Sequence, residues 1–265
     1  MQENIKMHEE LIRFRNKLLA KIKKTDTFLN VLGTDNVFVA GLSGGIDSLT
    51  MLDLLFHYKA KNNLSFNLHA VFIDNSLKNL KNADVIQKFV EERRFIFAII
   101  QDTSSKIIIE KRLKPFRPCF VCSRERRRLL LEYASKIGAR KILLAHTLDD
   151  VLETLFLNMF YSRGISTLMP LQPLFNGEYY ISRPIILLEK KEIIKYAYLA
   201  RIPMDLEGKC ISEDENKRKI VREFLGEIYK KDPKIKNNLK HALFGYNQDF
   251  MWTKFREIKT KLIGR

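Results

Sequence analysis

The chain has 265 residues, of which 46% are hydrophobic and 29% charged, and this balance excludes a chain that is disordered throughout. Lysine and arginine number 47 against 31 acidic residues, so the formal net charge is +16, which suggests a polyanionic partner such as a nucleic acid, with a merely basic, soluble surface as the equally open alternative. The sequence has no run of 18 apolar residues and no secretory leader pattern, so we expect a cytoplasmic protein with no membrane partner.

The predicted elements alternate between helices and strands. We expect an amphipathic helix over 4–30, then strands at 37–40, 68–73, 95–100 and 141–145 and helices over 49–58, 83–93, 124–137 and 149–160. Such alternation predicts an α/β fold, with a parallel sheet flanked by helices. Ligands of such sheets bind beyond the carboxyl ends of the strands, so polar residues that follow strands are the candidates for a site.

The pattern loosens after residue 162. Glycines and prolines predict a loop region up to Pro184, then a helix over 189–199, and residues 215–265 are predicted to be helical and rich in lysine, with a break at Asp232-Pro233. We therefore predict three parts: a basic N-terminal helix (1–32), a central α/β domain (33–212) and a basic helical C-terminal extension (213–265).

The turn after the first predicted strand is rich in glycine and hydroxyl groups, and it reads Ser43-Gly44-Gly45-Ile46-Asp47-Ser48. Glycines let the backbone turn its N–H groups towards a phosphate, and the N-terminus of the following helix favours the same anion. Asp47 beside a polyphosphate is explained if it holds Mg²⁺. A generic strand–helix turn is the alternative interpretation.

This string resembles the SGGxDS signature of the ATP pyrophosphatase family, also called the PP-loop family. The resemblance implies ATP binding by residues 43–48. It also implies a reaction in which AMP is attached to a carbonyl or amide oxygen, pyrophosphate leaves, and a nucleophile then displaces AMP.

Three cysteines are candidate metal ligands. Cys119 and Cys122 form a C-x-x-C pair in the most basic part of the chain, and Cys210 stands alone. A zinc site, a redox pair, an iron–sulfur cluster held by three cysteines, and ordinary buried thiols are all open interpretations.

The segment around this pair carries a closer resemblance. Residues 118–127, Pro-Cys-Phe-Val-Cys-Ser-Arg-Glu-Arg-Arg, are similar to the C-x-x-C-S-R-x-R-R segment of tRNA 2-thiocytidine synthetases, and the similarity continues through 138–142, 146–150, 153–161 and 183–184. Cys210 falls at the position of the third cluster cysteine of that family. The resemblance implies a 4Fe-4S cluster on Cys119, Cys122 and Cys210, with tRNA as the partner.

The activity implied by this resemblance is thiolation of the tRNA cytidine at position 32. ATP would adenylate the C2 oxygen, and a sulfide bound to the open iron of the cluster would then attack C2. A cysteine desulfurase or inorganic sulfide would be the sulfur donor, and a homodimer is an expected assembly.

The sequence departs from the family pattern at three places, so other functions stay possible. Ile46 stands where the family usually has lysine, Ala145 replaces the first of two histidines, and a cysteine close to Cys210 is missing. The alternatives are an enzyme similar to tRNA(Ile)-lysidine synthetase, a thiolase of another tRNA position, and a non-catalytic, zinc-stabilised tRNA-binding protein. Iron content separates the first and the last of these from the cluster enzyme.

Polar residues after the predicted strands complete the site. His146, Asp149 and Asp150 follow the fourth strand, and the acidic pair is typical either of Mg²⁺ ligation and proton transfer or of a helix N-terminus. Arg126 lies one turn after Cys122, where it could reach a phosphate or the activated base. We assign catalysis to Asp47, Asp149, Asp150 and Arg126, and ATP binding to residues 43–48, Asp74 and His146. Arg183 is a further candidate phosphate contact, and Arg124, Arg127 and Arg128 are candidates for contacts with tRNA phosphates.

Overall fold

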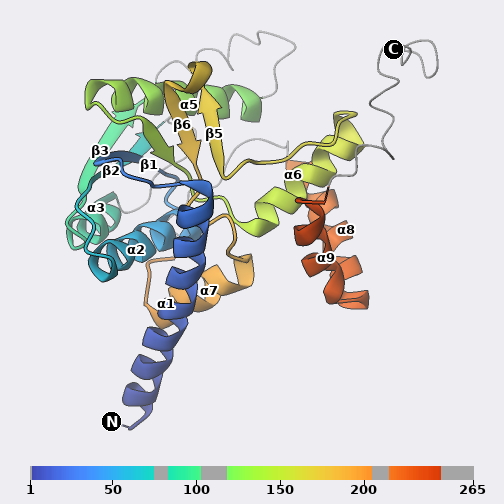
Figure 1. The fold of residues 1–265 in the computed structure, drawn as a ribbon, viewed down its shortest axis with the longest axis horizontal. Helices are drawn as coiled ribbons and strands as arrows, with labels where there is room; N and C mark the ends of the chain where they lie inside the picture. Colours follow the sequence, from blue (N-terminus) through green and yellow to red (C-terminus); the bar gives the residue numbers. More distant parts are fainter. Residues whose placement is uncertain (1, 75–82, 103–117, 205–214, 246–265) are drawn as a thin grey trace. The chain divides into compact units, whose positions relative to one another are not determined.

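The computed structural model describes residues 2–74, 83–102, 118–204 and 215–245 (Figure 1). Its helices are α1 (Gln2–Leu29), α2 (Ile46–Lys61), α3 (Ala83–Glu91), α5 (Pro118–Lys136), α6 (Leu148–Tyr161), the short 3-10 helix η1 (Phe175–Gly177), α7 (Lys190–Leu199), α8 (Glu215–Lys231) and α9 (Lys234–Ala242). Its strands are β1 (Val37–Leu42), β2 (Asn67–Asp74), β3 (Ile96–Gln101), β4 (Lys141–Leu143), β5 (Leu171–Leu174) and β6 (Tyr179–Ser182).

These strands form one sheet in the order β3-β2-β1-β4-β6-β5. All neighbouring pairs are parallel except β5 with β6, which is antiparallel. The chain runs outward from β1 through β2 to β3 and then crosses to β4 on the other side of β1. The predicted α/β fold with a parallel sheet is therefore confirmed, and the point where the strand order reverses lies between β1 and β4.

Helices cover both faces of this sheet (Figure 1). Alternate residues of β1 point to opposite faces: Phe38 and Ala40 belong to the core packed by α1, α2 and α7, whereas Val39 belongs to the core packed by α5. All three side chains are fully buried. This explains why β1 reads as a continuous apolar run, as strands covered on both faces do.

The sequence-based prediction missed two strands. The glycines and prolines between Ser162 and Pro184 predict a loop, but the region contains β5 and β6, and β6 lies beside β4 within the sheet. Both strands have four residues, and β5 contains Pro173, so local patterns there are too short to indicate strands. Two helices also begin earlier than expected: α2 at Ile46 and α5 at Pro118.

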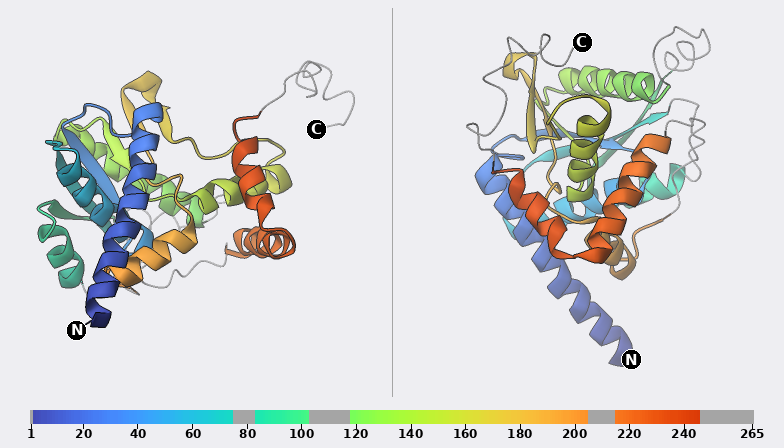
Figure 2. Two further views of the ribbon diagram at one scale, coloured as in Figure 1. Left: turned by 60° about the horizontal axis from the view of Figure 1, so that its bottom comes forward. Right: turned by 90° about the vertical axis from the view of Figure 1, so that its right-hand side faces the viewer.

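The described chain divides into two compact units, residues 1–220 and 221–265. Within the first unit, α1 packs on α2 and α7, with Leu18 and Ile22 fully buried, as its predicted amphipathic pattern requires. The part of the second unit that is described, 221–245, contains the end of α8 and all of α9, which meet at a sharp turn at Asp232-Pro233 (Figure 2). The predicted boundaries at 32 and 212 stay predictions. No described helix has the length and apolarity to cross a membrane.

Candidate functional site

Two loops meet where the strand order reverses. Ala40 of β1 pairs with Leu143 of β4, so Ser43 and His146 each lie three residues beyond a paired position. The turn at residues 43–48 and the segment from His146 to Asp150 therefore leave the same edge of the sheet. In open α/β sheets this crevice is the usual place for a ligand.

The turn at residues 43–48 is shaped by its own hydroxyl groups. Gly44 has a φ of +78°, which glycine adopts without strain. The Gly45 N–H donates to Ser43 Oγ (3.2 Å), and Ser48 Oγ donates to the Gly45 carbonyl (2.8 Å). Ser48 is buried, so its side chain stabilises the turn from inside. Helix α2 begins at Ile46, directly after the glycines, so its positive N-terminal end lies at this turn.

Lys190 joins this turn to the loop after β4. Its Nζ donates to Asp47 Oδ1 (2.6 Å) and also binds the second carboxylate oxygen, while its backbone N–H donates to Asp149 Oδ2 (2.7 Å). Lys190 is the first residue of α7, whose start is fixed by a capping box between Glu189 and Glu192. Asp47 and Asp149, both predicted from the sequence, therefore contact the same residue, Lys190, which the sequence patterns do not indicate.

The two acids of the Asp149-Asp150 pair have different partners. Asp150 turns back to its own helix, where its Oδ2 accepts from the Thr147 N–H and from Thr147 Oγ, both at 2.8 Å. These contacts form a capping box at the start of α6. The structure thus places Asp150 as a helix cap, whereas Asp149 contacts α7.

Asp74 ends β2, the neighbour of β1 in the sheet. Its Oδ2 accepts from the side-chain amide of Gln101 (3.1 Å), the last residue of β3. The side chain is half-buried. It lies at the same sheet edge as the turn at residues 43–48, one strand further from the reversal point.

His146 is held by Arg183, the residue that follows β6. Arg183 Nε–H donates to His146 Nδ1 (3.1 Å), while its other nitrogens donate to the Met169 carbonyl (2.6 Å) and to Gln172 Oε1 (3.3 Å). Burial, together with the charge of Arg183, lowers the pKa of His146 to about 4. The imidazole is therefore neutral at pH 7, and because Nδ1 accepts a hydrogen bond, Nε2 carries the proton.

Arg183 itself is only 3% exposed, and burial lowers its pKa to about 10. Its side chain donates to His146, Met169 and Gln172, and the expected phosphate contact from Arg183 stays a prediction.

Arg126 is half-buried on α5, and its charge contributes to the lowered pKa of His146, so these two predicted residues are near each other. On the same helix Arg124 and Arg128 bind the buried carboxylate of Glu125, at 3.2 and 2.8 Å. Both guanidinium groups stay about half exposed, and Arg127 is exposed as well. These arginines make the exposed side of α5 basic, and Glu125 of the same helix holds Arg124 and Arg128 in place.

The predicted cluster ligands are only partly covered by the described residues. Positions 119 and 122 lie one turn apart in the first turns of α5, and Cys122 is half-buried. The side chain of Cys119, the whole of Cys210 and the basic segment 103–117 lie outside the described residues. Among those described, no group of three or more His, Cys, Asp or Glu residues forms a metal site.

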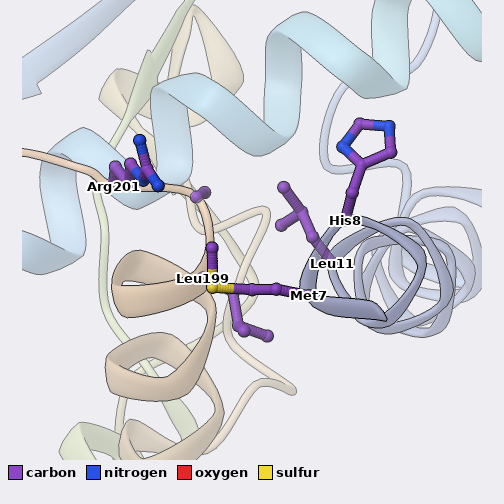
Figure 3. Close-up of a pocket in the computed structure, with 6 residues that line it drawn as sticks. Met7, His8, Leu11, Leu199 and Arg201 are labelled. Carbon is purple, nitrogen blue, oxygen red and sulfur yellow. The ribbon is translucent and has the colours of Figure 1, made fainter. Parts of the chain in front are cut away.

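A cavity of about 420 Å³ lies elsewhere, between α1 and the end of α7 (Figure 3). Its lining residues are Met7, His8, Leu11, Leu199, Ala200 and Arg201. None of them belongs to the predicted site.

Comparisons with known proteins give the same picture of the fold and place the chain among enzymes. The model of the PP-loop domain matches residues 15–227. A tRNA-cytidine(32) 2-sulfurtransferase of Aliivibrio fischeri is 33% identical over 222 residues, covering 82% of this chain and 72% of the relative. A protein of the same name from Acinetobacter baumannii is 32% identical over 240 residues, with 89% and 77% covered.

Among solved structures, the U34-tRNA thiolase NcsA from Methanococcus maripaludis with its 4Fe-4S cluster superposes with a TM-score of 0.71. The sequence identity is 22%, and the match covers 86% of this chain and 77% of the other. At this identity the likeness concerns the fold.

Proposed function

The chain belongs to the PP-loop family, with relatives named tRNA-cytidine(32) 2-sulfurtransferase, and from this premise we propose that it is an ATP-dependent enzyme that thiolates cytidine 32 of tRNA. The observation that carries the proposal is the turn at residues 43–48, which lies at the reversal point of the sheet and leaves the same sheet edge as the segment with His146 and Asp149. A tRNA substrate would place the enzyme in the cytoplasm.

ATP binding is assigned to the turn and to the acids around it. Backbone N–H groups at the start of α2 would hold the phosphates, with Gly44 and Gly45 allowing their close approach. Asp47 and Asp149 offer the hard carboxylate oxygens that Mg²⁺ prefers, and both reach the same residue of α7, so these acids fit a magnesium ion carried in with the nucleotide. Asp150 would support this pair indirectly by fixing the start of α6.

The neutral imidazole of His146 would donate a hydrogen bond through Nε2. Its proton is held there because Arg183 occupies Nδ1. A donor of this kind stabilises negative charge on a phosphate or base oxygen without itself losing a proton. We therefore assign His146 to electrostatic stabilisation during adenylation, with the charge of Arg126 nearby for the same purpose.

A 4Fe-4S cluster fits the chemistry of the donor set. Cys119 and Cys122 lie one turn apart near the N-terminus of α5, where the helix dipole favours thiolates, and Cys210 would complete three ligands. When bound, such a cluster would supply iron to which sulfur binds. All three thiols of the chain are then used as ligands.

The overall reaction balances in two steps. The C2 oxygen of cytidine attacks the α-phosphorus of ATP, so a C–O–P linkage forms and pyrophosphate leaves. Hydrosulfide then attacks C2, the C–O bond breaks, AMP leaves with the oxygen, and a proton is released as thiocytidine forms. The sulfur would come from a cysteine desulfurase or from inorganic sulfide, and a homodimer remains an expected assembly.

The test uses protein purified without oxygen, tRNA transcribed without modifications, ATP, Mg²⁺ and sulfide. We expect 2-thiocytidine in nuclease digests analysed by mass spectrometry, pyrophosphate release that depends on tRNA, and iron near four per chain. The variants C119A, C122A and C210A are each expected to lose thiolation, and D47A is expected to lose pyrophosphate release.

Two results would contradict the proposal. Lysidine in the digest, made by protein without iron, would indicate the lysidine synthetase alternative. Tight tRNA binding by a zinc-containing protein that releases no pyrophosphate would indicate a binding protein without catalysis.

A further inference from the structure

We propose that Lys190 is the phosphate-binding cation of the ATP site, which pairs with Asp47 when nucleotide is absent and binds the polyphosphate when MgATP enters. This inference rests on the proposed function, because it assumes that the turn at residues 43–48 holds ATP. It assigns a role to a residue that no motif in the sequence indicates, since Lys190 is 143 positions away from its partner in the turn.

The charges of the turn require a cation from elsewhere. Of its six residues only Asp47 is ionised, and it is negative. Even with Mg²⁺ bound to it, the triphosphate of ATP keeps a net negative charge, and it meets a like charge at this carboxylate unless a further cation lies close by. The residue before Asp47 is Ile46, which is uncharged, so the turn itself brings no cation. Lys190 is a cation that binds Asp47.

The position of Lys190 suits a side chain that changes partner. Its backbone is fixed, because its N–H binds Asp149 and it begins a capped helix. Its ammonium lies at the end of a flexible four-carbon stem, and the side chain is 41% exposed. A fixed backbone with a mobile, accessible ammonium can move from a carboxylate to a neighbouring phosphate without any movement of α7.

A purely structural ion pair is the alternative role. Asp47 and Lys190 are 28% and 41% exposed, and pairs with this much contact with water stabilise proteins little. The two roles also predict different binding behaviour. If Lys190 exchanges Asp47 for phosphate when MgATP binds, removing the ammonium takes one competing cation away from Asp47. The variant should then favour a divalent cation at Asp47 and bind the nucleotide more weakly. A structural role would move both affinities in the same direction.

The experiment compares three variants of the iron-containing protein. Lys190→Met removes the charge and keeps the stem, Lys190→Arg keeps the charge, and Lys191→Met is the matched control. Lys191 is the next residue of α7, is 77% exposed and pairs with Glu189. Dissociation constants are measured for MgATP by calorimetry without tRNA, and for Mn²⁺ alone, as a spectroscopic substitute for Mg²⁺, by electron paramagnetic resonance without nucleotide.

We expect K190M to bind MgATP about tenfold more weakly, which is the effect of losing one charge-assisted hydrogen bond. The same variant should bind Mn²⁺ more tightly than the wild type, and its affinity for tRNA should be unchanged. K190R and K191M should bind MgATP as the wild type does. If K190M is poorly folded, K190Q replaces it in both measurements.

Two results would overturn the inference. One is an affinity of K190M for MgATP within about twofold of the wild type, which is less than one charge-assisted hydrogen bond contributes. The other is a parallel loss of MgATP and Mn²⁺ binding together with a lower melting temperature, which would indicate a structural pair. A wild-type protein that does not bind MgATP would instead contradict the proposed function, so the two failures are distinguishable.

Discussion

The protonation state of His146 is set first by burial and then by the charge of Arg183. Arg183 donates to Nδ1, and burial lowers the pKa to about 4. We expect the ring to stay neutral from pH 8 to about pH 5, so its NMR titration should have a midpoint near 4 instead of the ordinary value near 6.5. A midpoint above 6 would contradict the assigned hydrogen-bond pattern. Arg183→Met should move the midpoint upward, because a nearby positive charge is lost.

This shift has a consequence for stability. A histidine whose pKa is lowered by folding stabilises the fold above its unfolded pKa, and that contribution is lost as the pH falls. The part due to His146 should therefore decline between about pH 6.5 and pH 4. Burial also lowers the pKa of His57 and of His69, so the total loss of stability in acid is shared and the NMR midpoint is the specific measurement.

The assigned proton on Nε2 predicts which replacement preserves function. The amide nitrogen of glutamine can take the place of Nε2, whereas that of asparagine lies nearer the place of Nδ1. His146→Gln should therefore retain more tRNA-dependent pyrophosphate release than His146→Asn, by roughly tenfold, the value of one well-placed hydrogen bond. Equal losses in the two variants would show that donation from Nε2 is not used.

At the scale of single residues, the sequence indicates which residues belong to the candidate site better than it indicates what each of them does. The string at 43–48 is local, so its shape follows from its glycines and hydroxyls. The roles of Lys190 and Arg183 depend on contacts across 143 and 37 positions, and no local pattern reports them. Asp150 caps α6 through Thr147, three residues earlier in the chain, and its predicted catalytic role stays a prediction beside this one.

At the scale of the elements, α7 is held against α1, α2 and α3 by buried polar contacts. Asp53 of α2 is 4% exposed, and it accepts from the Tyr196 hydroxyl of α7 (2.5 Å) and from Arg93 after α3 (2.6 and 2.8 Å). Arg15 of α1 donates to the same hydroxyl (2.9 Å). Because α7 begins with Lys190, this network helps to keep the ammonium within reach of Asp47.

Removing the Tyr196 hydroxyl therefore tests how α7 is anchored. Tyr196→Phe deprives a buried carboxylate of one donor, and we expect a loss of about 1–3 kcal/mol in the free energy of unfolding. Urea unfolding followed by circular dichroism measures it. Tyr198→Phe is the matched control, because Tyr198 lies on the same helix, is 70% exposed and should change stability little. Equal stability of the two variants would contradict the structural importance of this network.

Predictability differed among the elements for a physical reason. Long helices and strands buried on both faces have strong local patterns, so α1, α2, β1 and β2 were predicted close to where they lie. The strand β6 is stabilised by pairing with β4 and β5. Its four residues, Tyr-Tyr-Ile-Ser, are too few to show the alternation of apolar and polar residues that would predict a strand. It matters for the site because Arg183 follows directly from it.

At the scale of the whole molecule, the net charge of +16 predicts binding to tRNA that depends strongly on salt. Lys231 and Lys234, which flank the turn between α8 and α9, are both exposed. If both contact phosphates, K231Q/K234Q should lower the slope of log affinity against log salt by about 1 to 2, and leave MgATP binding unchanged. The matched control is K88Q/R94Q, which removes two exposed charges at and after α3, outside the C-terminal extension. Filter binding between 50 and about 200 mM salt measures both slopes. If both double variants show the same slope of log affinity against log salt, the C-terminal extension contributes only its net charge. Direct contacts with tRNA would instead make Lys231 and Lys234 matter more than the control pair.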